Sequence, residues 1–419
     1  MKTITVIIII FLVAYHYCFG QKEGLLNLFQ EKQFVKMELA NHDRKADDFY
    51  FFKAVFANVC NNPNLSNRYL DTLQAKEIPA TLMLKYWKLR ADNYVKLFDY
   101  KKAYETNHYI NEHFKSEFTS DHYKGSVNTE LIWKSLQYEK VQKIGLNGQV
   151  SVPFTKDFGD LYNVKVSINK IDTSFVFDTG AGISVISESL AKQLGLKVFE
   201  NDSIKVSGFT GIGNKTKLAI ADSISIGNLK IYNPYFLIFE DQALTFAEGK
   251  YKINGIIGFP ILKEIGTITI TKNKIQFSNA FKQKTIKNKN LFTEYLHPIL
   301  YLNFNGDMLP FCFDTGGNET LFSKTFFDRY KTILEAVSHE TSTQKIASAG
   351  GEISYSSMTM KKIHLKLNTV SVVLKNLEIN KEGYHRFGKE YYGNLGKDAL
   401  SQFSKVIISF KGSYLELKR

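Results

Sequence analysis

The first third of the chain carries apolar side chains at intervals of three and four residues. From residue 21 to about 140, Leu, Phe, Tyr and Ala recur at this spacing, and proline is nearly absent. A repeat of this kind places apolar side chains on one face of a helix. The pattern therefore predicts a helical domain over residues 21–145.

The stretch Tyr86–Phe114 has the most regular of these patterns. Its large and small apolar residues fall where the helical hairpin of the tetratricopeptide repeat family places its packing residues, and it resembles that family. Ala57 stands 34 residues before Ala91 and begins a poorer second copy. The resemblance implies a surface that binds a protein partner. A helical domain that packs on its own chain explains the pattern equally well.

The pattern of apolar positions changes near Val150. Short runs of Val, Ile, Phe and Thr alternate with polar residues and are punctuated by Gly and Asn. Alternation with a period of two predicts strands. A basic, weakly apolar stretch at residues 282–290 interrupts the strands and predicts a linker. We therefore expect one β domain over residues 146–281 and another over residues 291–419.

The two β domains are predicted to be copies of each other. No gap is needed to lay LYNVKVSINKIDTSFVFDTGAGISVIS over HPILYLNFNGDMLPFCFDTGGNETLFS, which places Asp178 over Asp314. A second pair of stretches, GIIGFPIL and GNLGKDAL, also matches. Gly258 comes 80 residues after Asp178, and Gly396 comes 82 residues after Asp314. Two landmarks at nearly equal spacing indicate a duplicated domain.

Each of the two aspartates ends an apolar run and is followed by Thr and Gly. A twofold axis could bring Asp178 and Asp314 together. Two negative charges at so short a distance repel each other, so the two carboxyl groups would share one proton. The ionised member can act as a general base on water, and the protonated member can polarise a carbonyl group. This chemistry needs no metal and no cofactor, and we expect neither.

The D-T-G-A motif, followed about 80 residues later by two apolar residues and Gly, resembles the retropepsin-type aspartic peptidases. Two copies in one chain resemble the arrangement of pepsin-like enzymes, over residues 150–419. The resemblance implies a mainly β fold, a bilobal pepsin/retropepsin-like β-barrel pseudo-dimer, preceded by the α-helical domain. It also implies that Asp178 and Asp314 are the catalytic dyad.

The same resemblance implies supporting residues around the dyad. The strands at Ile256–Gly258 and Leu395–Gly396 would lie beside the catalytic loops. A Gly-rich hairpin flap in each copy would cover an extended peptide. The expected loop residues are Thr179, Gly180, Ala181, Thr315, Gly316 and Gly317. The expected flap residues are Gly208, Phe209, Thr210 and Gly211 in the first copy, and Ala349, Gly350 and Gly351 in the second.

The sequence departs from the family pattern in ways that bear on its chemistry. Ala181 and Gly317 follow the two D-T-G motifs, so neither copy carries the hydroxyl that pepsin-like enzymes usually have there. Fewer hydrogen bonds would stabilise the ionised carboxylate less, and we expect an activity optimum less acidic than a pepsin's. In the second copy Asn394 stands where the first has Ile256. A second copy that kept its fold but lost catalysis would also look like this.

The N-terminus predicts a secretory signal over residues 1–20. Lys2 precedes the apolar block ITVIIIIFLVAY, which is too short to span a bilayer comfortably. Small residues at Cys18 and Gly20 fit cleavage before Gln21. We expect an exported protein, in the periplasm, at the cell surface or outside the cell, with no membrane insertion after cleavage. The alternatives are an uncleaved N-terminal anchor and a lipid-modified Cys18, for which the preceding Tyr17 is a poor fit.

Composition and charge narrow the range of partners. An apolar content of 44% is globular and allows a sizeable core. The formal net charge of +13 is spread along the chain without a basic helix, so we expect no nucleic-acid partner. Cys60 and Cys312 lie in different predicted domains, so we expect no disulfide between them. The nine histidines are scattered and form no H-E-x-x-H metal motif.

Two functions from different classes remain. The first is a secreted aspartic endopeptidase that uses Asp178 and Asp314. The second is a noncatalytic peptide- or protein-binding protein that keeps the cleft and docks a partner on its helical domain. A homodimer in which each chain supplies one aspartate is a further alternative. Residues 21–140 would act as an inhibitory prosegment, a recruiting module or a structural support.

Overall fold

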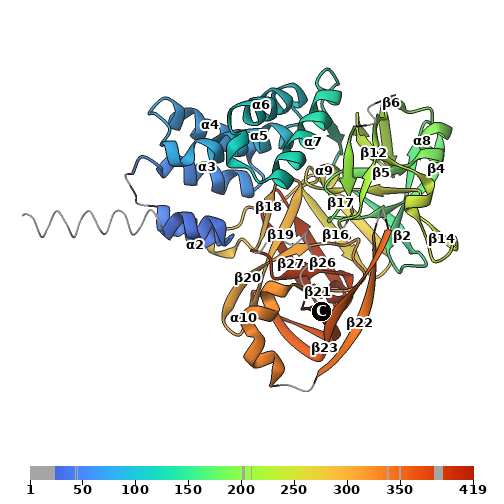
Figure 1. Ribbon diagram of the computed structural model, residues 1–419. Helices are drawn as coiled ribbons and strands as arrows, with labels where there is room; N and C mark the ends of the chain where they lie inside the picture. Colours follow the sequence, from blue (N-terminus) through green and yellow to red (C-terminus); the bar gives the residue numbers. More distant parts are fainter. Residues whose placement is uncertain are drawn as a thin grey trace, which may run out of the picture.

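The computed structural model describes residues 24–42, 44, 46–200, 203–208, 210–336, 339–348, 351–381 and 390–419. The predicted signal at residues 1–20 lies outside them. The N-terminal part is helical, as predicted, and forms one blue-to-teal group beside the strands (Figure 1). None of the helices in the described part of the chain could cross a membrane. After a helical stretch at residues 24–30, these helices are α2 (Phe34–Asn41), α3 (Phe49–Val59), α4 (Pro63–Gln74), α5 (Met83–Lys96), α6 (Tyr100–His113) and α7 (Ser120–Leu136).

Polar side chains mark where several of these helices begin. Asn62 accepts a hydrogen bond from the Leu65 N–H before α4, where Pro63 occupies the first turn. Asp99 likewise accepts from the N–H of Lys102 before α6. These side chains satisfy backbone donors that have no partner in the first turn of a helix. Local sequence therefore sets the helix starts.

The helical region, meaning the described residues up to Leu136, shares a hydrophobic core with the strands that follow. Phe34 packs against Phe292 and Tyr301, with ring centroids 5.6 and 6.5 Å apart. The Tyr301 hydroxyl accepts a hydrogen bond of 2.6 Å from the Phe34 N–H. The buried Lys96 of α5 donates to the Thr293 carbonyl at 3.1 Å. The helical region is thus built into the fold.

The first half, residues 146–281, forms most of a large mixed sheet. Strand β3 shows why: Val164, Val166 and Ile168 are buried, whereas Lys165 between them is exposed. Alternate residues of a strand face opposite sides, so this pattern buries one face. The strands on the main path are β2 (Gln149–Lys156), β3 (Tyr162–Ile168), β4 (Ile171–Phe177), β5 (Ser184–Ser187), β6 (Lys197–Phe199), β9 (Lys217–Ile220), β12 (Tyr235–Phe239), β15 (Gly255–Ile257), β16 (Thr267–Thr271) and β17 (Lys274–Ser278).

The second half, residues 291–419, forms a separate eight-stranded sheet and then crosses to the first. Its last two strands extend the first half's sheet, with Ile408 of β26 paired to Ile268 of β16. The strands are β18 (Leu291–Glu294), β19 (His297–Phe304), β20 (Asp307–Phe313), β21 (Leu321–Phe322), β22 (His339–Ser348), β23 (Gly351–Leu367), β24 (Val370–Asn380), β25 (Gly393–Leu395), β26 (Lys405–Ser409) and β27 (Tyr414–Lys418).

The two halves repeat one arrangement of strands around the predicted landmarks. In the first half β15 lies parallel to β4 and antiparallel to β5. In the second half β25 lies parallel to β20 and antiparallel to β21. A parallel neighbour then follows in each half, β12 beside β5 and β24 beside β21. The internal repeat in the sequence is therefore also a repeat of topology.

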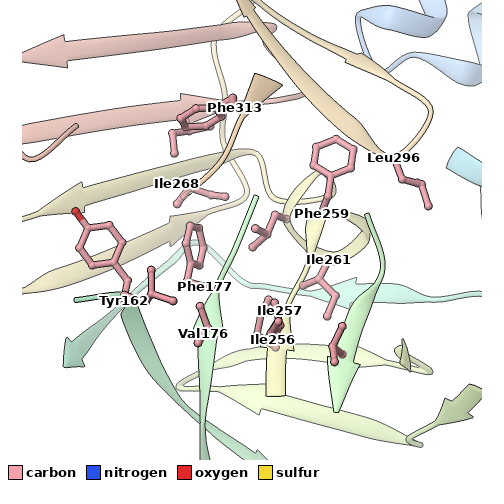
Figure 2. Packing of buried hydrophobic residues seen from close by; sticks show 14 of the residues in the cluster. Tyr162, Val176, Phe177, Ile256, Ile257, Phe259, Ile261, Ile268, Leu296 and Phe313 are labelled. Atoms are coloured by element: carbon pink, nitrogen blue, oxygen red, sulfur yellow. The ribbon is translucent and has the colours of Figure 1, made fainter. Parts of the chain in front are cut away.

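A common core lies beneath the two D-T-G motifs. Phe177 and Phe313, which directly precede the aspartates, are fully buried members of one hydrophobic cluster. Figure 2 shows them with Ile257 and Phe259 of the first landmark. This packing anchors both strand ends in the same rigid interior.

Candidate active site

The two D-T-G loops hold their aspartates with the same backbone hydrogen bonds. Asp178 N–H donates to the Ile257 carbonyl, and Asp314 N–H donates to the Leu395 carbonyl, each at 3.1 Å. The Oδ1 atom of Asp178 accepts hydrogen bonds from the N–H groups of Gly180 and Ala181, at 2.7 and 3.2 Å. The Oδ1 atom of Asp314 accepts from its equivalents at 2.8 and 3.0 Å. The donors are Gly180, Ala181, Gly316 and Gly317.

The threonines of the two motifs clasp each other across the halves. Thr179 Oγ1 donates to the Phe313 carbonyl at 2.9 Å and accepts from the Thr315 N–H at 3.0 Å. Thr315 Oγ1 donates to the Phe177 carbonyl at 3.0 Å and accepts from the Thr179 N–H at 3.0 Å. Both threonines are fully buried. This reciprocal set fixes the two loops relative to each other.

The motif glycines bring the two carboxyl groups face to face. A Cβ atom added to Gly180 would lie 2.5 Å from Cγ of Asp314. A Cβ atom added to Gly316 would lie 2.3 Å from Cγ of Asp178. Both distances are far below contact, so only glycine permits this approach. The pair forms within one chain, and the homodimer alternative is not needed.

The proximity of the carboxyl groups changes their ionisation. Burial raises the pKa of Asp178 well above its usual range, and the charge of Asp314 and a hydrogen bond to it raise this pKa further. The N–H groups of Gly180 and Ala181 act in the opposite direction. A proton is therefore held within the pair at pH values where an isolated aspartate would have lost it.

The landmark stretches around Gly258 and Gly396 are hydrogen-bonded to the segments that follow the two D-T-G loops. The Ser184 hydroxyl accepts from the Gly258 N–H at 3.0 Å, and the Thr320 hydroxyl accepts from the Gly396 N–H at 3.0 Å. Ser184 and Thr320 are buried and occupy matching positions in the two copies. The strands at Ile256–Gly258 and Leu395–Gly396 thus lie beside the loops.

One contact at the dyad has no counterpart in the other half. Asn394 Nδ2 donates to Oδ2 of Asp314 at 2.8 Å. The matching residue of the first half, Ile256, has no polar group to donate. In the sequence alone, Asn394 stands out only as an irregularity of the second copy. The signal that could have identified its role was a polar residue in an otherwise apolar landmark beside an aspartate.

Two hairpins from different halves meet near the dyad. The first joins β7 (Lys205–Ser207) to β8 (Gly213–Lys215), and the second joins β22 to β23. Thr210 N–H donates to the Ser348 hydroxyl at 3.0 Å. Of the predicted flap residues, the structure places Gly208, Thr210, Gly211 and Gly351 in or beside these hairpins, while Phe209, Ala349 and Gly350 lie outside the described residues.

A cavity of about 1110 Å³ opens above the dyad. Gly208, Lys345 and Ser348 of the two hairpins contribute to its wall. The volume exceeds that of a usual small-ligand pocket and fits several residues of a peptide. No cluster of side chains suited to hold a metal ion is found among the described residues.

The helical region supplies one wall of the same cavity. Four residues of α7 that line it are Gly125, Thr129, Ile132 and Trp133. A fifth, Asn128, also accepts a hydrogen bond of 2.7 Å from the Lys205 N–H at the base of the first hairpin. Helical periodicity alone did not indicate this position, because it reports which face is apolar and not what covers it.

Comparison with known proteins finds a family model that matches part of the first half. Residues 164–261 match the model of the aspartyl protease family. The chain is also similar to the crystal structure of a retropepsin-like aspartic protease from Rickettsia conorii, with 17% identity and a TM-score of 0.23. That similarity covers 35% of this chain and 99% of the other.

A second similar structure is that of basic 7S globulin from soybean, with 10% identity and a TM-score of 0.41, covering 65% of this chain and 94% of the other. No curated protein sequence matches this chain. The family match covers the stretch that carries Asp178 and Gly258, and it supports an aspartic-protease-like fold for the first half.

Proposed function

We propose that the protein is an aspartic endopeptidase that hydrolyses peptide bonds with water activated by Asp178 and Asp314. The observation that carries the proposal is the face-to-face approach of the two carboxyl groups at one cavity. In this proposal the two halves act as the lobes of a bilobal pepsin/retropepsin-like pseudo-dimer. The reciprocal threonine contacts and the repeated topology support that arrangement.

The proposed reaction moves two protons and forms no covalent enzyme intermediate. The ionised carboxylate takes a proton from water, and the water oxygen bonds to the carbonyl carbon. The protonated carboxyl gives its proton to the carbonyl oxygen, which yields a neutral gem-diol. On collapse the C–N bond breaks, the amine receives the proton taken from water, and a gem-diol hydroxyl returns a proton to the other carboxylate. The dyad ends as it began.

The cavity supports an extended peptide or protein segment as substrate. Its volume holds several residues, and the two hairpins offer strand edges to an extended chain. We further propose that the helical region is a permanent wall of this cleft, rather than a removable prosegment. Its shared core with Phe292 and Tyr301 and the buried contact of Lys96 support this role.

Export is part of the proposal and rests on the N-terminal sequence alone. The apolar block after Lys2 and the small residues near Gly20 fit a signal that is removed on secretion. Fractionation of expressing cells, followed by N-terminal sequencing of the protein, would test it. A mature chain that begins near Gln21 is the expected result.

Digestion of a mixed peptide library tests the proposed activity. The full chain is incubated with the library from about pH 3 to pH 8, and products are identified by mass spectrometry. The control is the double variant Asp178→Asn/Asp314→Asn, purified in parallel. We expect new termini with the unmutated chain only. Peptide binding without cleavage at any pH would instead support the noncatalytic alternative.

A further inference from the structure

The two halves differ at two positions beside the dyad. After the D-T-G motif the first half has Ala181 and the second has Gly317. In the landmark strand the first half has Ile256 and the second has Asn394. The second half has thus exchanged an Ala/Ile pair for a Gly/Asn pair, while its backbone arrangement is kept.

These two exchanges belong together in space. A Cβ atom added to Gly317 would lie 3.3 Å from Oδ2 of Asp314 and 3.4 Å from Nδ2 of Asn394. Both separations are tight for a methyl group. The absent side chain at Gly317 therefore leaves room for the Asn394 amide to reach the carboxylate.

The amide contact makes the surroundings of the two aspartates unequal. Apart from the hydrogen bond between the two carboxyl groups, Asp314 accepts from three donors among the described residues, namely two backbone N–H groups on Oδ1 and the Asn394 amide on Oδ2. Asp178 accepts from two backbone N–H groups, both on Oδ1. Asn394 is 5% exposed, so its amide reaches Asp314 with little competition from solvent. Donors favour the charged form of a carboxyl group over the neutral form.

We propose that Asn394 is a positioning residue that holds Asp314 as the ionised, water-activating member of the dyad and leaves the shared proton on Asp178. This inference rests on the proposed peptidase function and assigns its two chemical roles. Asp314 then takes the proton from water, and Asp178 gives its proton to the substrate carbonyl. The raised pKa of Asp178 agrees with this assignment.

Other titratable groups also line the cavity above the dyad. They are the same in the unmutated chain and in the variants below, so a comparison between variants isolates the amide. These groups are Asp92, Lys205, Tyr251, Glu294, Tyr295, His297, Cys312, Glu319, Lys345, Tyr355, Glu378 and Tyr391.

The test transplants the first half's pair into the second half with Gly317→Ala/Asn394→Ile. The first half already accommodates Ala beside Ile, so the fold should tolerate the pair. Without the amide, the acidic limb of the pH profile of kcat/KM should move up by about one to two pH units, since a hydrogen bond to a charged group has that effect. The single variant Asn394→Leu, of nearly equal size, should move it in the same direction.

The mirror variant Ala181→Gly/Ile256→Asn is the matched control. It offers a second amide to the dyad, so the acidic limb should move down. A purely structural role of Asn394 would lower kcat at all pH values and leave the limb in place. An unmoved limb in active Asn394 variants, or a downward shift, would overturn the assignment.

A second readout keeps the inference separate from the proposed activity. A carboxylate favoured in the folded state stabilises the protein at higher pH, and this stabilisation is lost as the carboxylate is protonated. The free energy of unfolding should therefore differ more between the unmutated chain and Asn394→Leu at about pH 7 than at about pH 3. An equal difference at both pH values would overturn the inference, whether or not the chain cleaves peptides.

Discussion

The Asp178 loop and the Asp314 loop are built with the same backbone devices and finished with different side chains. Both loops use two N–H groups on Oδ1, a buried threonine that clasps the other loop, and a glycine that permits close approach. Among the described residues, a side-chain amide donates to the second carboxylate oxygen of Asp314 and not to that of Asp178. The shared hydrogen bonds and glycines bring the two carboxyl groups together. The Asn394 amide gives Asp314 a hydrogen-bond donor that Asp178 does not have.

The hairpins show the same mixture of repetition and divergence. The first half has a short one, with three residues in each of β7 and β8. The second half has a long one, with 10 residues in β22 and 17 in β23. Both nevertheless reach the same cavity and contact each other through Thr210 and Ser348. The two halves therefore agree more closely in the geometry of the dyad than in the length of their hairpins. The following changes probe how far the two halves are equivalent.

The largest effect is expected from Gly316→Ala or Gly180→Ala. Each new methyl group would overlap the opposing carboxyl group, because the Cβ position lies 2.3 or 2.5 Å from its Cγ. Positioned acid–base groups contribute about 10²–10⁴-fold to a rate, and we expect a loss of kcat/KM of about 10³-fold for each variant. Gly24→Ala, where nothing lies within 4 Å of the new Cβ, is the control. Retention of a tenth of the activity by either loop variant would contradict the face-to-face geometry.

The threonine contacts should show equal importance of the two halves for stability. Thr179→Val and Thr315→Val each remove a hydroxyl that both donates and accepts across the halves. Each should lower the free energy of unfolding by about 1–3 kcal/mol, because a buried N–H loses its partner. Urea unfolding of the single and double variants measures this, and any departure of the double variant from the sum measures the coupling between the two threonines. A large effect in one half alone would show that the contacts are not reciprocal.

In the proposed mechanism, the raised pKa of Asp178 sets the alkaline limb of activity. The shared proton is present below this pKa and is lost as the pH rises through it. Cleavage should therefore peak above about pH 3 and fall on the alkaline side, as kcat/KM measured against pH would show. Asn394 adds a donor that the sequence-based expectation of a mild optimum did not include. An optimum below about pH 3 would contradict the dominance of burial and the neighbouring charge at Asp178.

The smallest effect is expected from the helical wall. Gly125 of α7 lines the cavity, and nothing lies within 4 Å of a Cβ atom added there. Gly125→Leu should raise the stability of the fold by up to about 1 kcal/mol through helix propensity, and should narrow the cavity. The library cleavage pattern should shift toward smaller side chains, with Gly125→Ala as the control. An unchanged pattern would mean that the substrate does not reach α7.

The internal repeat and the spacing of apolar residues were sufficient to predict the features that depend on short, local patterns. These are the two aspartates, the glycines beside them and the helical character of the N-terminal region. Three features were not predicted, because they depend on contacts between distant segments. They are the Asn394 contact, the wall supplied by α7, and the crossing of β26 to the first half's sheet. An internal repeat shows which positions match, but it does not show what a mismatched residue touches.

The kinetics of the single variants Asp178→Asn and Asp314→Asn test the central claim most directly. Both should be compared with the double variant on the best peptide found in the library. If the two halves form one catalytic dyad, each single substitution alone should reduce kcat/KM to the level of the double variant. If Asp314→Asn kept activity within about tenfold of the unmutated chain, its carboxyl group would lack the role of an acid–base catalyst. The second half would then be a scaffold for the first.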